Sequence, residues 1–370
     1  MSSGYARENP FTPSFGQVPL HPAGRDILVS RFAAALERTR RSPELTTLVS
    51  GARGTGKTSL LSMVSDEAQQ RGWVSVDVVA EPGMLEDIYI QALRNSRHIA
   101  NRVGADARLT GVGIGRLFSV EWEPGGEEPS NWRSRMEDLI DELNGQGLGL
   151  LITVDEVDPS VEEFVHLAST YQLFVRSGRK VGLFMAGLPY CIEKAKERIR
   201  ISSMRRANHV LLSRIDDSEV ERTMRLTIEG AGKEIPDSAL SAAVEAAGGF
   251  PFMIQLVGYR MWEESGDRPS ITADDVERGV DAARRELRSY VLESTYRELS
   301  DGDLAFLRAM LPDSGLSTMP DIAARMGKTA SYASVYRERL LLKGIIGEAD
   351  RGKYSFDLPD FKEFLAERLG

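Results

Sequence analysis

The chain has 370 residues, with 46 Lys and Arg against 55 Asp and Glu, so its formal net charge is −9. This length allows two or three domains that each bury a core, and the acidic balance argues against a protein coated in nucleic acid while leaving room for a local basic face. No apolar stretch approaches the roughly 18 residues of a membrane helix, and the N-terminus lacks the apolar core of a signal peptide. Cys191 is the single cysteine, which excludes an internal disulfide. We therefore expect a cytoplasmic protein with no membrane partner.

The first part of the chain predicts an extended strap followed by an α/β unit. Residues 1–23 contain four prolines, which fix φ and lack an amide donor and so disfavour helix and strand. Over 24–215, short apolar runs alternate with helical patterns, which indicates a parallel sheet with helices on both faces. A glycine-containing stretch over 97–129 predicts a surface insertion with a hairpin at 108–122. The expected elements are strands at 46–50, 74–80, 148–154 and 181–186, and helices at 26–41, 57–71 and 130–144.

The second part predicts two further units. Helical patterns continue from 216 to 288 without strands, which indicates a small all-helical lid. From 289 to 370, helical patterns precede two short strands, which is the order of a winged helix-turn-helix. The expected elements are lid helices at 218–229, 238–247, 252–264 and 272–288, then helices at 301–311, 319–326 and 331–343 and strands at 345–348 and 353–357.

The strongest motif is a full match to GxxxxGK[ST] between a predicted strand and a predicted helix. Its glycines let successive backbone amides converge on one point, and the helix N-terminus adds a partial positive charge. We expect Lys57 to reach the β- and γ-phosphates of a nucleotide and the Thr58 hydroxyl to bind Mg²⁺. The predicted phosphate-binding residues are Gly51, Ala52, Arg53, Gly54, Thr55, Gly56, Lys57, Thr58 and Ser59.

Two acids follow the apolar run that ends at Val154. A magnesium-nucleotide site needs a carboxylate on a strand beside the phosphate loop, and Asp155 is suited to hold the ion through its water shell. Glu156 is the candidate base that orients and polarises the attacking water. The sequence therefore predicts an ATPase that uses ATP, ADP and Mg²⁺, with Lys57 and Glu156 in catalytic roles.

The order of these parts resembles the AAA+ superfamily of P-loop NTPases. More narrowly, it is similar to bacterial ATPases related to the origin-recognition initiators, which grade into STAND-type signalling ATPases. The resemblance implies that Gly24 and Arg25 lie against the adenine and that the lid segment at Pro251 closes over the base and ribose. Its motifs are the phosphate loop, Val154-Asp155-Glu156, Ala23-Gly24-Arg25-Asp26, Ala186-Gly187-Leu188-Pro189 and Gly248-Gly249-Phe250-Pro251.

The chain departs from that family pattern in three ways. Gly187 stands where these ATPases place a polar residue that touches the γ-phosphate, and Pro251 stands where initiators place an arginine. Arg205 and Arg206 fit best as the finger that a neighbouring copy would supply, and a solvated basic face is the alternative. Such a finger raises the rate roughly 10³–10⁵-fold, so we expect slow turnover without a homo-oligomer or a partner. The other arginines near that position are Arg198, Arg200 and Arg214.

The C-terminal unit is locally basic, because residues 321–353 hold seven bases and four acids, a net charge of +3. Hydroxyls and arginines near the start of a recognition helix suit contacts to duplex DNA, and we expect Val335, Leu340 and Leu341 to face the core. The alternative is a protein-docking module in a signalling or scaffold ATPase that holds its nucleotide as a latch. The predicted DNA contacts are Lys328, Ser331, Tyr332, Tyr336, Arg337, Arg339 and Arg351.

Overall fold

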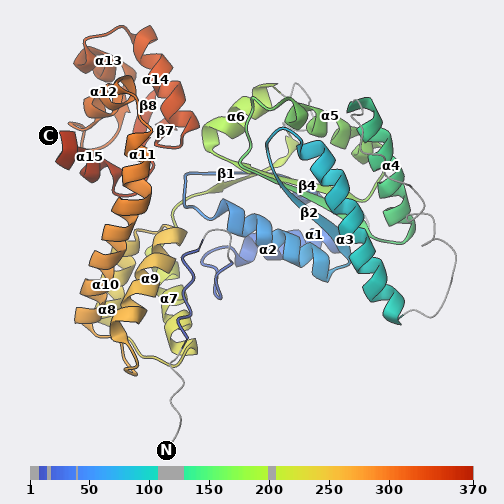
Figure 1. Ribbon diagram of the computed structural model, residues 1–370, viewed down its shortest axis with the longest axis horizontal. Helices are drawn as coiled ribbons and strands as arrows, with labels where there is room; N and C mark the ends of the chain where they lie inside the picture. Colours follow the sequence, from blue (N-terminus) through green and yellow to red (C-terminus); the bar gives the residue numbers. More distant parts are fainter. Residues whose placement is uncertain (1–7, 15–17, 39–40, 107–128, 199–205, 370) are drawn as a thin grey trace, which may run out of the picture.

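The computed structural model describes residues 8–14, 18–38, 41–106, 129–198 and 206–369. These residues form an α/β unit, a helical unit and a C-terminal unit, and a long helical run joins the last two (Figure 1). Within the described part of the chain, no helix is both long and apolar enough to cross a bilayer.

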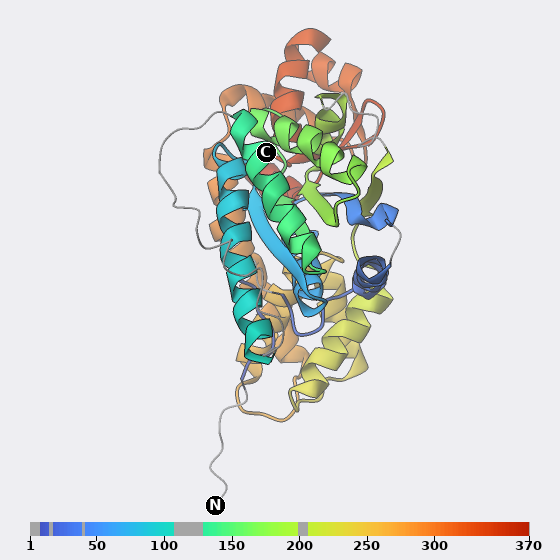
Figure 2. The ribbon, with the colours of Figure 1, turned by 90° about the vertical axis from the view of Figure 1, so that its right-hand side faces the viewer.

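The α/β unit is built on a parallel sheet with the strand order β2-β3-β4-β1-β5. One face of the sheet packs on α3, α4 and α5, two of which stand in front of it in Figure 2, and the other face packs on α1 and α2. This arrangement confirms the predicted α/β fold class. The strands are β1 (Thr46–Gly51), β2 (Trp73–Val79), β3 (Gly149–Asp155), β4 (Val181–Gly187) and β5 (Asn208–Leu212), and the helices are α1 (Asp26–Glu37), η1 (Pro43–Leu45), α2 (Lys57–Gln70), α3 (Met84–Asp106), α4 (Pro129–Gly145), α5 (Glu162–Arg176) and α6 (Pro189–Arg198).

The parallel register of the sheet brings the C-terminal ends of its central strands close together. Ser50 of β1 lies opposite Gly187 of β4, and Val154 of β3 lies opposite Met185. The edge strand β5, which the sequence pattern does not predict, pairs with β1 so that Gly51 lies opposite Leu212. Motifs that are far apart in the sequence therefore meet where the strands end.

Helix α3 reaches into the first residues of the expected insertion at 97–129. Helix α3 continues through residue 97 to Asp106, because Leu85, Ile88 and Ala92 bury one face at helical spacing before the glycine-rich stretch begins. The hairpin predicted at 108–122 lies outside the described residues.

The helical unit carries the N-terminal strap on its surface. The Phe11 ring is buried against α9, where a Cβ on Gly258 would overlap it. The strap also donates two hydrogen bonds to α9: Asn9 Nδ2 donates to the Tyr259 carbonyl at 3.0 Å, and the Thr12 amide donates to Gln255 Oε1 at 3.0 Å. The helices of this unit are α7 (Asp217–Gly230), α8 (Asp237–Ala247), α9 (Pro251–Ser265) and α10 (Ala273–Glu286).

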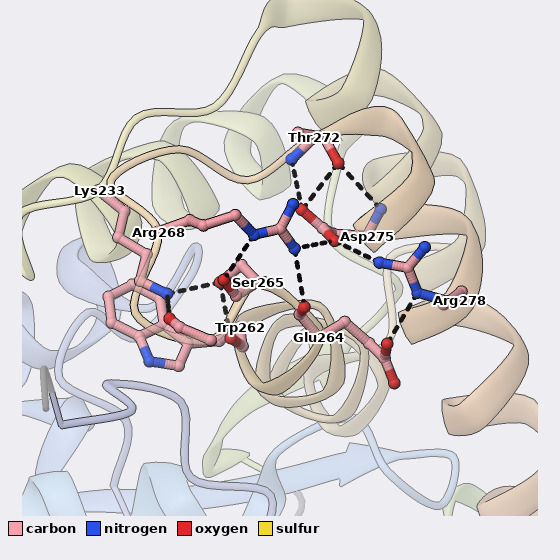
Figure 3. A network of polar contacts seen from close by, with 9 residues as sticks. Lys233, Trp262, Glu264, Ser265, Arg268, Thr272, Asp275 and Arg278 are labelled. Carbon is pink, nitrogen blue, oxygen red and sulfur yellow. Dashed lines mark hydrogen bonds and ion pairs between the residues drawn. The ribbon is translucent and has the colours of Figure 1, made fainter.

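A buried lysine ties the loop after α7 to the end of α9 (Figure 3). Lys233 is 1% exposed, and its ammonium donates to Ser265 Oγ and to the Gly266 carbonyl. The same ammonium lies 4.2 Å from the centre of the Trp262 ring. These partners supply the hydrogen bonds and the cation–π contact that a buried ammonium needs.

A buried carboxylate begins α10 beside that lysine (Figure 3). Asp275 accepts from the Thr272 amide and hydroxyl in a capping box, and it pairs with Arg268 and Arg278. Burial acts to raise the pKa of Asp275, but the hydrogen bonds from Thr272 and Arg268 outweigh it and hold the pKa below its usual value. The acid is therefore charged at neutral pH and fixes the turn between α9 and α10.

A continuous helical run leads from the lid into the C-terminal unit. Helix α10 continues through the π-helical η3 (Leu287–Leu292) into α11 (Glu293–Arg297), and one hydrophobic cluster runs from the lid through Leu287 and Leu292 to Phe306. The remaining elements are α12 (Asp301–Met310), β6 (Ser317–Thr318), α13 (Met319–Met326), α14 (Ala330–Leu342), β7 (Ile346–Asp350), β8 (Lys353–Phe356) and α15 (Phe361–Leu369), and the strands pair antiparallel in the order β6-β8-β7.

One predicted core position on α14 is wrong. Leu340 and Leu341 are buried as expected, but Val335 is 57% exposed. The buried face of the helix passes through Ala333, and at 100° per residue Val335 points roughly 200° away from it.

Loss of the Asp275 charge is expected to destabilise the lid. We predict that Asp275→Asn lowers the free energy of unfolding by about 1.5–3 kcal/mol, because hydrogen bonds to a charged group are weakened in a buried network. Urea denaturation of the full chain measures this. The neighbouring, exposed Asp274→Asn is the matched control and should stay within about 0.5 kcal/mol of the wild type. Equal stabilities of the two variants would contradict the role of Asp275 in fixing this turn.

Candidate functional site

The phosphate loop joins β1 to α2 through glycines that its path requires. Gly54 and Gly56 have φ of +75° and +82°, values that favour glycine. Gly51 is required for a different reason, since a Cβ there would lie 2.9 Å from the Leu212 carbonyl oxygen of β5. Within the loop, Thr55 Oγ1 donates to the Ala52 carbonyl at 2.8 Å. The predicted loop residues therefore form one compact turn ahead of α2.

Lys57 at the start of α2 reaches back over this turn. Its Nζ donates to the carbonyls of Gly51 at 2.9 Å and Ala52 at 2.8 Å. Burial disfavours the charged ammonium and lowers the pKa of Lys57 to about 8, against the opposing effects of Asp155 and Glu156. A bound phosphate would add negative charge beside this partly buried cation.

The two residues predicted to hold Mg²⁺ touch each other. Thr58 Oγ1 donates to Asp155 Oδ2 at 2.5 Å, which joins the first turn of α2 to the end of β3. A hydroxyl and a carboxylate are oxygen ligands of the kind that Mg²⁺ prefers, so the residues present fit this ion.

Glu156, the candidate base, follows directly and has an unusual backbone. Its φ is +50°, a value that costs energy for a residue with a Cβ, and its amide donates to Asp155 Oδ1 at 2.8 Å. The side chain is exposed and lines the same pocket as Lys57. The turn therefore places Asp155 against Thr58 and Glu156 at the wall of the pocket.

A side chain in place of Gly187 at the end of β4 would make a tight contact with the turn after β3. A Cβ there would lie 3.1 Å from the Cβ of Val157, whose amide donates to the Ala186 carbonyl at 2.9 Å. The turn after Glu156 packs on this glycine, which explains the departure from the family pattern at this position.

A pocket of about 800 Å³ opens beside Lys57 and Glu156. Its walls come from the phosphate loop, the turn after β3 and α6, and also from α14 of the C-terminal unit. Burial raises the pKa of the Cys191 thiol in this wall to about 11, so the thiol stays protonated at neutral pH. The lining includes Arg53, Asp158, Tyr190, Cys191, Lys194 and Glu338.

The segments that the resemblance assigns to the base side of the nucleotide also meet at the phosphate loop. Arg25 Nη2 donates to the Thr55 carbonyl at 2.9 Å, and burial lowers the pKa of its guanidinium. The Gly24 amide donates to Glu219 Oε1 of α7 at 3.2 Å. Pro251 begins α9 against the loop, because a Cβ on Gly56 would lie 3.5 Å from Pro251 Cγ. The lid therefore rests on the phosphate loop through the start of α9.

The candidate finger arginines divide by their contacts. Arg198 donates to the Pro159 carbonyl and pairs with Glu162 at 3.1 Å, and the Arg214 guanidinium lies 4.5 Å from the centre of the Phe250 ring. Arg206 is exposed ahead of β5, whereas Arg200 and Arg205 lie outside the described residues.

The residues predicted to contact DNA also divide into two groups. Arg339 pairs with the buried Asp303 at 3.0 Å, Arg337 Nη1 lies 3.5 Å from the Tyr354 hydroxyl, and the half-buried Tyr336 donates to the Tyr332 hydroxyl at 3.0 Å. These contacts support the fold of the C-terminal unit. The residues that are exposed to solvent are Lys328, Ser331, Tyr332, Arg351 and also Arg339, whose side chain stays 44% exposed in its ion pair.

Sequence reasoning missed the pocket residues of α6 and α14. Tyr190 and Cys191 follow the motif that ends at Pro189 but belong to no phosphate-binding pattern. Glu338 lies in the helix expected to contact DNA. A contact between residues 148 positions apart leaves no periodic signal in one sequence, so only the tertiary structure reveals it.

Comparison with known proteins agrees with this geometry. Residues 21–177 match the family described as the AAA ATPase domain. The chain contains an AAA+ ATPase domain. Residues 289–365 match a second family, described as a domain of unknown function (DUF8462). The search of curated proteins found no match.

Solved structures share the fold over nearly the whole chain. The ORC2 protein of Aeropyrum pernix is 15% identical, with a TM-score of 0.62 over 98% of this chain and 97% of that one. The Walker-type ATPase paby2304 of Pyrococcus abyssi is 16% identical, with a TM-score of 0.64 over 95% and 100%. Cdc6p from Pyrobaculum aerophilum is 14% identical, with a TM-score of 0.52 over 96% of each chain. These likenesses confirm the AAA+ fold.

The lowered pKa of Lys57 predicts how nucleotide affinity depends on pH. Phosphate binds the protonated ammonium, and the pKa of about 8 means that this form is lost as the pH rises through 8. We expect ATP affinity to hold between pH 6.8 and 7.5 and then to fall by up to about tenfold per pH unit, with proton uptake on binding. Isothermal titration in buffers of different ionisation enthalpy measures both quantities. An affinity that stays constant from pH 7 to 9 would contradict a pKa of about 8 for Lys57.

Proposed function

We propose that this AAA+ protein binds ATP together with Mg²⁺, hydrolyses it, and uses the cycle to reposition its lid and C-terminal unit. The observation that carries the proposal is the contact between Thr58 and Asp155, with Lys57 and Glu156 facing one pocket beside it. The Aeropyrum pernix ORC2 structure, which shares the fold, is described as complexes with ADPNP and ADP.

Each residue has a defined task in this proposal. The loop amides and Lys57 hold the β- and γ-phosphates, while Thr58 and Asp155 hold the magnesium ion, which neutralises charge on the phosphates when bound. Glu156 orients a water and takes its proton as the water oxygen attacks the γ-phosphorus. The bond between that phosphorus and the bridging oxygen breaks, which releases ADP and phosphate.

We expect slow turnover by the isolated chain, because the arginines near the site are engaged by other groups. The end of β4 offers Gly187 in place of a polar side chain, and Arg198 and Arg214 are engaged by Pro159, Glu162 and Phe250. Among the described residues, the exposed Arg206 is then the candidate for an arginine finger that a second copy inserts. Arg205 precedes it in the sequence. Self-association would accelerate hydrolysis for this reason.

The contacts between lid and loop explain how the cycle can produce movement. Pro251 rests on Gly56, Glu219 accepts from the Gly24 amide, and the Gly249 carbonyl accepts from the Ile215 amide at 2.8 Å. A nucleotide between these groups shifts the lid only to the extent that ATP and ADP favour different lid positions.

We further propose that the C-terminal unit acts as a winged helix that binds duplex DNA. Lys328, Ser331 and Tyr332 are exposed at the start of α14, and Arg351 is exposed in the turn between β7 and β8. A helix start and a wing on one unit suit contacts to a groove and its phosphates.

A second candidate is docking of a protein effector, with the nucleotide as a latch. The observation that favours it is the apolar surface on the same helix, where Val335 is 57% and Tyr332 is 44% exposed. The ion pair with the buried Asp303 also neutralises the charge of Arg339, one of the predicted DNA contacts.

Two substitutions test the hydrolysis proposal. Lys57→Ala should abolish measurable ATP binding, because the cation that holds the phosphates is removed. Glu156→Gln should bind ATP normally and lower turnover by about 10²–10⁴-fold, because an amide cannot accept the proton. Titration calorimetry and phosphate release measure the two effects. The control Glu193→Gln, an acid of α6 paired with Lys196, should leave both unchanged. Wild-type turnover in Glu156→Gln would refute the assigned base.

A second pair of variants separates DNA from protein docking. Joint Lys328→Glu and Arg351→Glu changes should weaken duplex binding at least about tenfold and flatten its salt dependence, while ATP binding persists. Val335→Asp should leave duplex affinity within twofold if DNA is the ligand. Fluorescence anisotropy at several salt concentrations measures these affinities. A wild-type protein that fails to bind duplex DNA in any nucleotide state would favour the protein-docking function.

A further inference from the structure

A carboxylate on the edge strand β2 accepts hydrogen bonds from two buried hydroxyl groups of neighbouring elements. Thr153 Oγ1 of β3 donates to Asp77 Oδ1 at 2.6 Å, and Ser65 Oγ of α2 donates to the same oxygen. Thr153 is 1% exposed and Ser65 is 2% exposed, so both hydroxyls depend on this acceptor. Hydrogen bonds to a carboxylate are about twice as strong as those between neutral groups. Asp77 therefore ties α2 to β2 and β3 at one point.

The same helix and strand carry the two residues that fit Mg²⁺. Thr58 and Ser65 are seven residues apart on α2, which is close to two helical turns, so both lie on one side of the helix. Thr153 and Asp155 are two residues apart on β3, so both point to one face of the sheet, and Thr153 lies opposite Asp77 in the register. The bond between Thr58 and Asp155 and the bonds at Asp77 are therefore two attachment points along one seam between α2 and β3.

Apolar packing fills the rest of this seam and fixes its geometry less strictly. Leu60, Leu61 and Val64 of α2 belong to the same hydrophobic cluster as Leu151 of β3. Such contacts are non-directional, whereas two hydroxyls that donate to one oxygen set both a distance and an angle. Mg²⁺ needs this precision, because it demands near-ideal octahedral geometry with ligands at about 2.0–2.1 Å.

We propose that Asp77 is a positioning residue for the magnesium ion. It acts through Ser65 and Thr153, which set the offset of α2 along β3 and with it the separation of the Thr58 hydroxyl and the Asp155 carboxylate. This inference rests on the metal site proposed above. Nucleotide binding without metal depends less on this offset, because Lys57 holds phosphate as a point charge on a flexible side chain.

Removal of the carboxylate separates metal binding from nucleotide binding. We expect Asp77→Ala to weaken Mg²⁺ binding to the complex of protein and ATP about tenfold, at the lower end of the range for residues that orient metal ligands without touching the metal. The affinity for ATP in EDTA should stay at the wild-type value. Calorimetric titration of MgCl₂ into protein in excess over ATP measures the first quantity, and titration of ATP in EDTA measures the second.

A conservative variant and a matched control identify the cause. Asp77→Asn keeps an oxygen that can accept from both hydroxyls, so its Mg²⁺ affinity should lie closer to the wild type than to Asp77→Ala. The control is Gln91→Ala, because Gln91 Nε2 donates to the Asp77 carbonyl at 3.1 Å. This change disturbs the same edge strand without touching the Asp77 carboxylate, and it should leave the Mg²⁺ affinity unchanged.

The Mg²⁺ dependence of turnover gives an independent readout. In Asp77→Ala, the Mg²⁺ concentration for half-maximal ATP hydrolysis should rise about tenfold, while turnover at saturating Mg²⁺ stays close to the wild type because the filled site has the same ligands. A general loosening of the fold would instead lower turnover at every Mg²⁺ concentration. If Asp77→Ala does not fold, joint Ser65→Ala and Thr153→Val changes remove both hydroxyls and must give the same shift.

The outcomes distinguish this inference from the proposed function. Wild-type Mg²⁺ affinity in Asp77→Ala would refute the positioning role and leave the ATPase proposal standing. An equal loss of Mg²⁺ affinity in Asp77→Asn and Asp77→Ala would also refute it, because the hydrogen bonds would then not be the cause. A wild-type protein that binds ATP but no Mg²⁺ beside it would overturn both proposals.

Discussion

The structure depends on one electrostatic constraint, a lysine ammonium held in a partly buried position where three parallel strands end. Lys57 bonds to the carbonyls of Gly51 and Ala52, and burial lowers its pKa to about 8. A cation placed in this way needs an anion, and the surrounding parts of the chain supply acids or leave room for phosphate. The turn after β3, the start of the lid and the C-terminal unit all meet around this charge.

The three units contact one another around the phosphate loop, in addition to being connected along the chain. The lid rests on the phosphate loop through Pro251, and the C-terminal unit reaches the same loop through Gly344 and Arg53. The lid and the C-terminal unit also share one hydrophobic cluster along the helical run from α10 to α11. A conformational change of the phosphate loop therefore alters contacts of both units. Because the two units share a hydrophobic core, moving one without the other would break that core and cost more free energy than moving them together.

Backbone strain and close packing account for the residues that depart from the family pattern. Glu156 takes a left-handed conformation, and its neighbour Val157 packs on Gly187 at the end of β4. A side chain at 187 would require Val157 to shift by a few tenths of an ångström, next to the turn that carries Asp155 and Glu156. The missing polar residue and the strained base are thus two aspects of one local arrangement.

The sequence by itself determined the phosphate loop, the acids after β3, the alternation of strands and helices, and the helical order of the lid and C-terminal unit. These features are local, because motif spacing and hydrophobic period act within a few turns of chain. Only the tertiary structure decided four other features. These are the length of α3, the exposure of Val335, the ion pair of Arg339 with Asp303 and the hydrogen bond of Tyr190 with Glu338. Each depends on which surfaces pack together between residues far apart in the sequence. The residue pattern of a single sequence does not indicate these contacts.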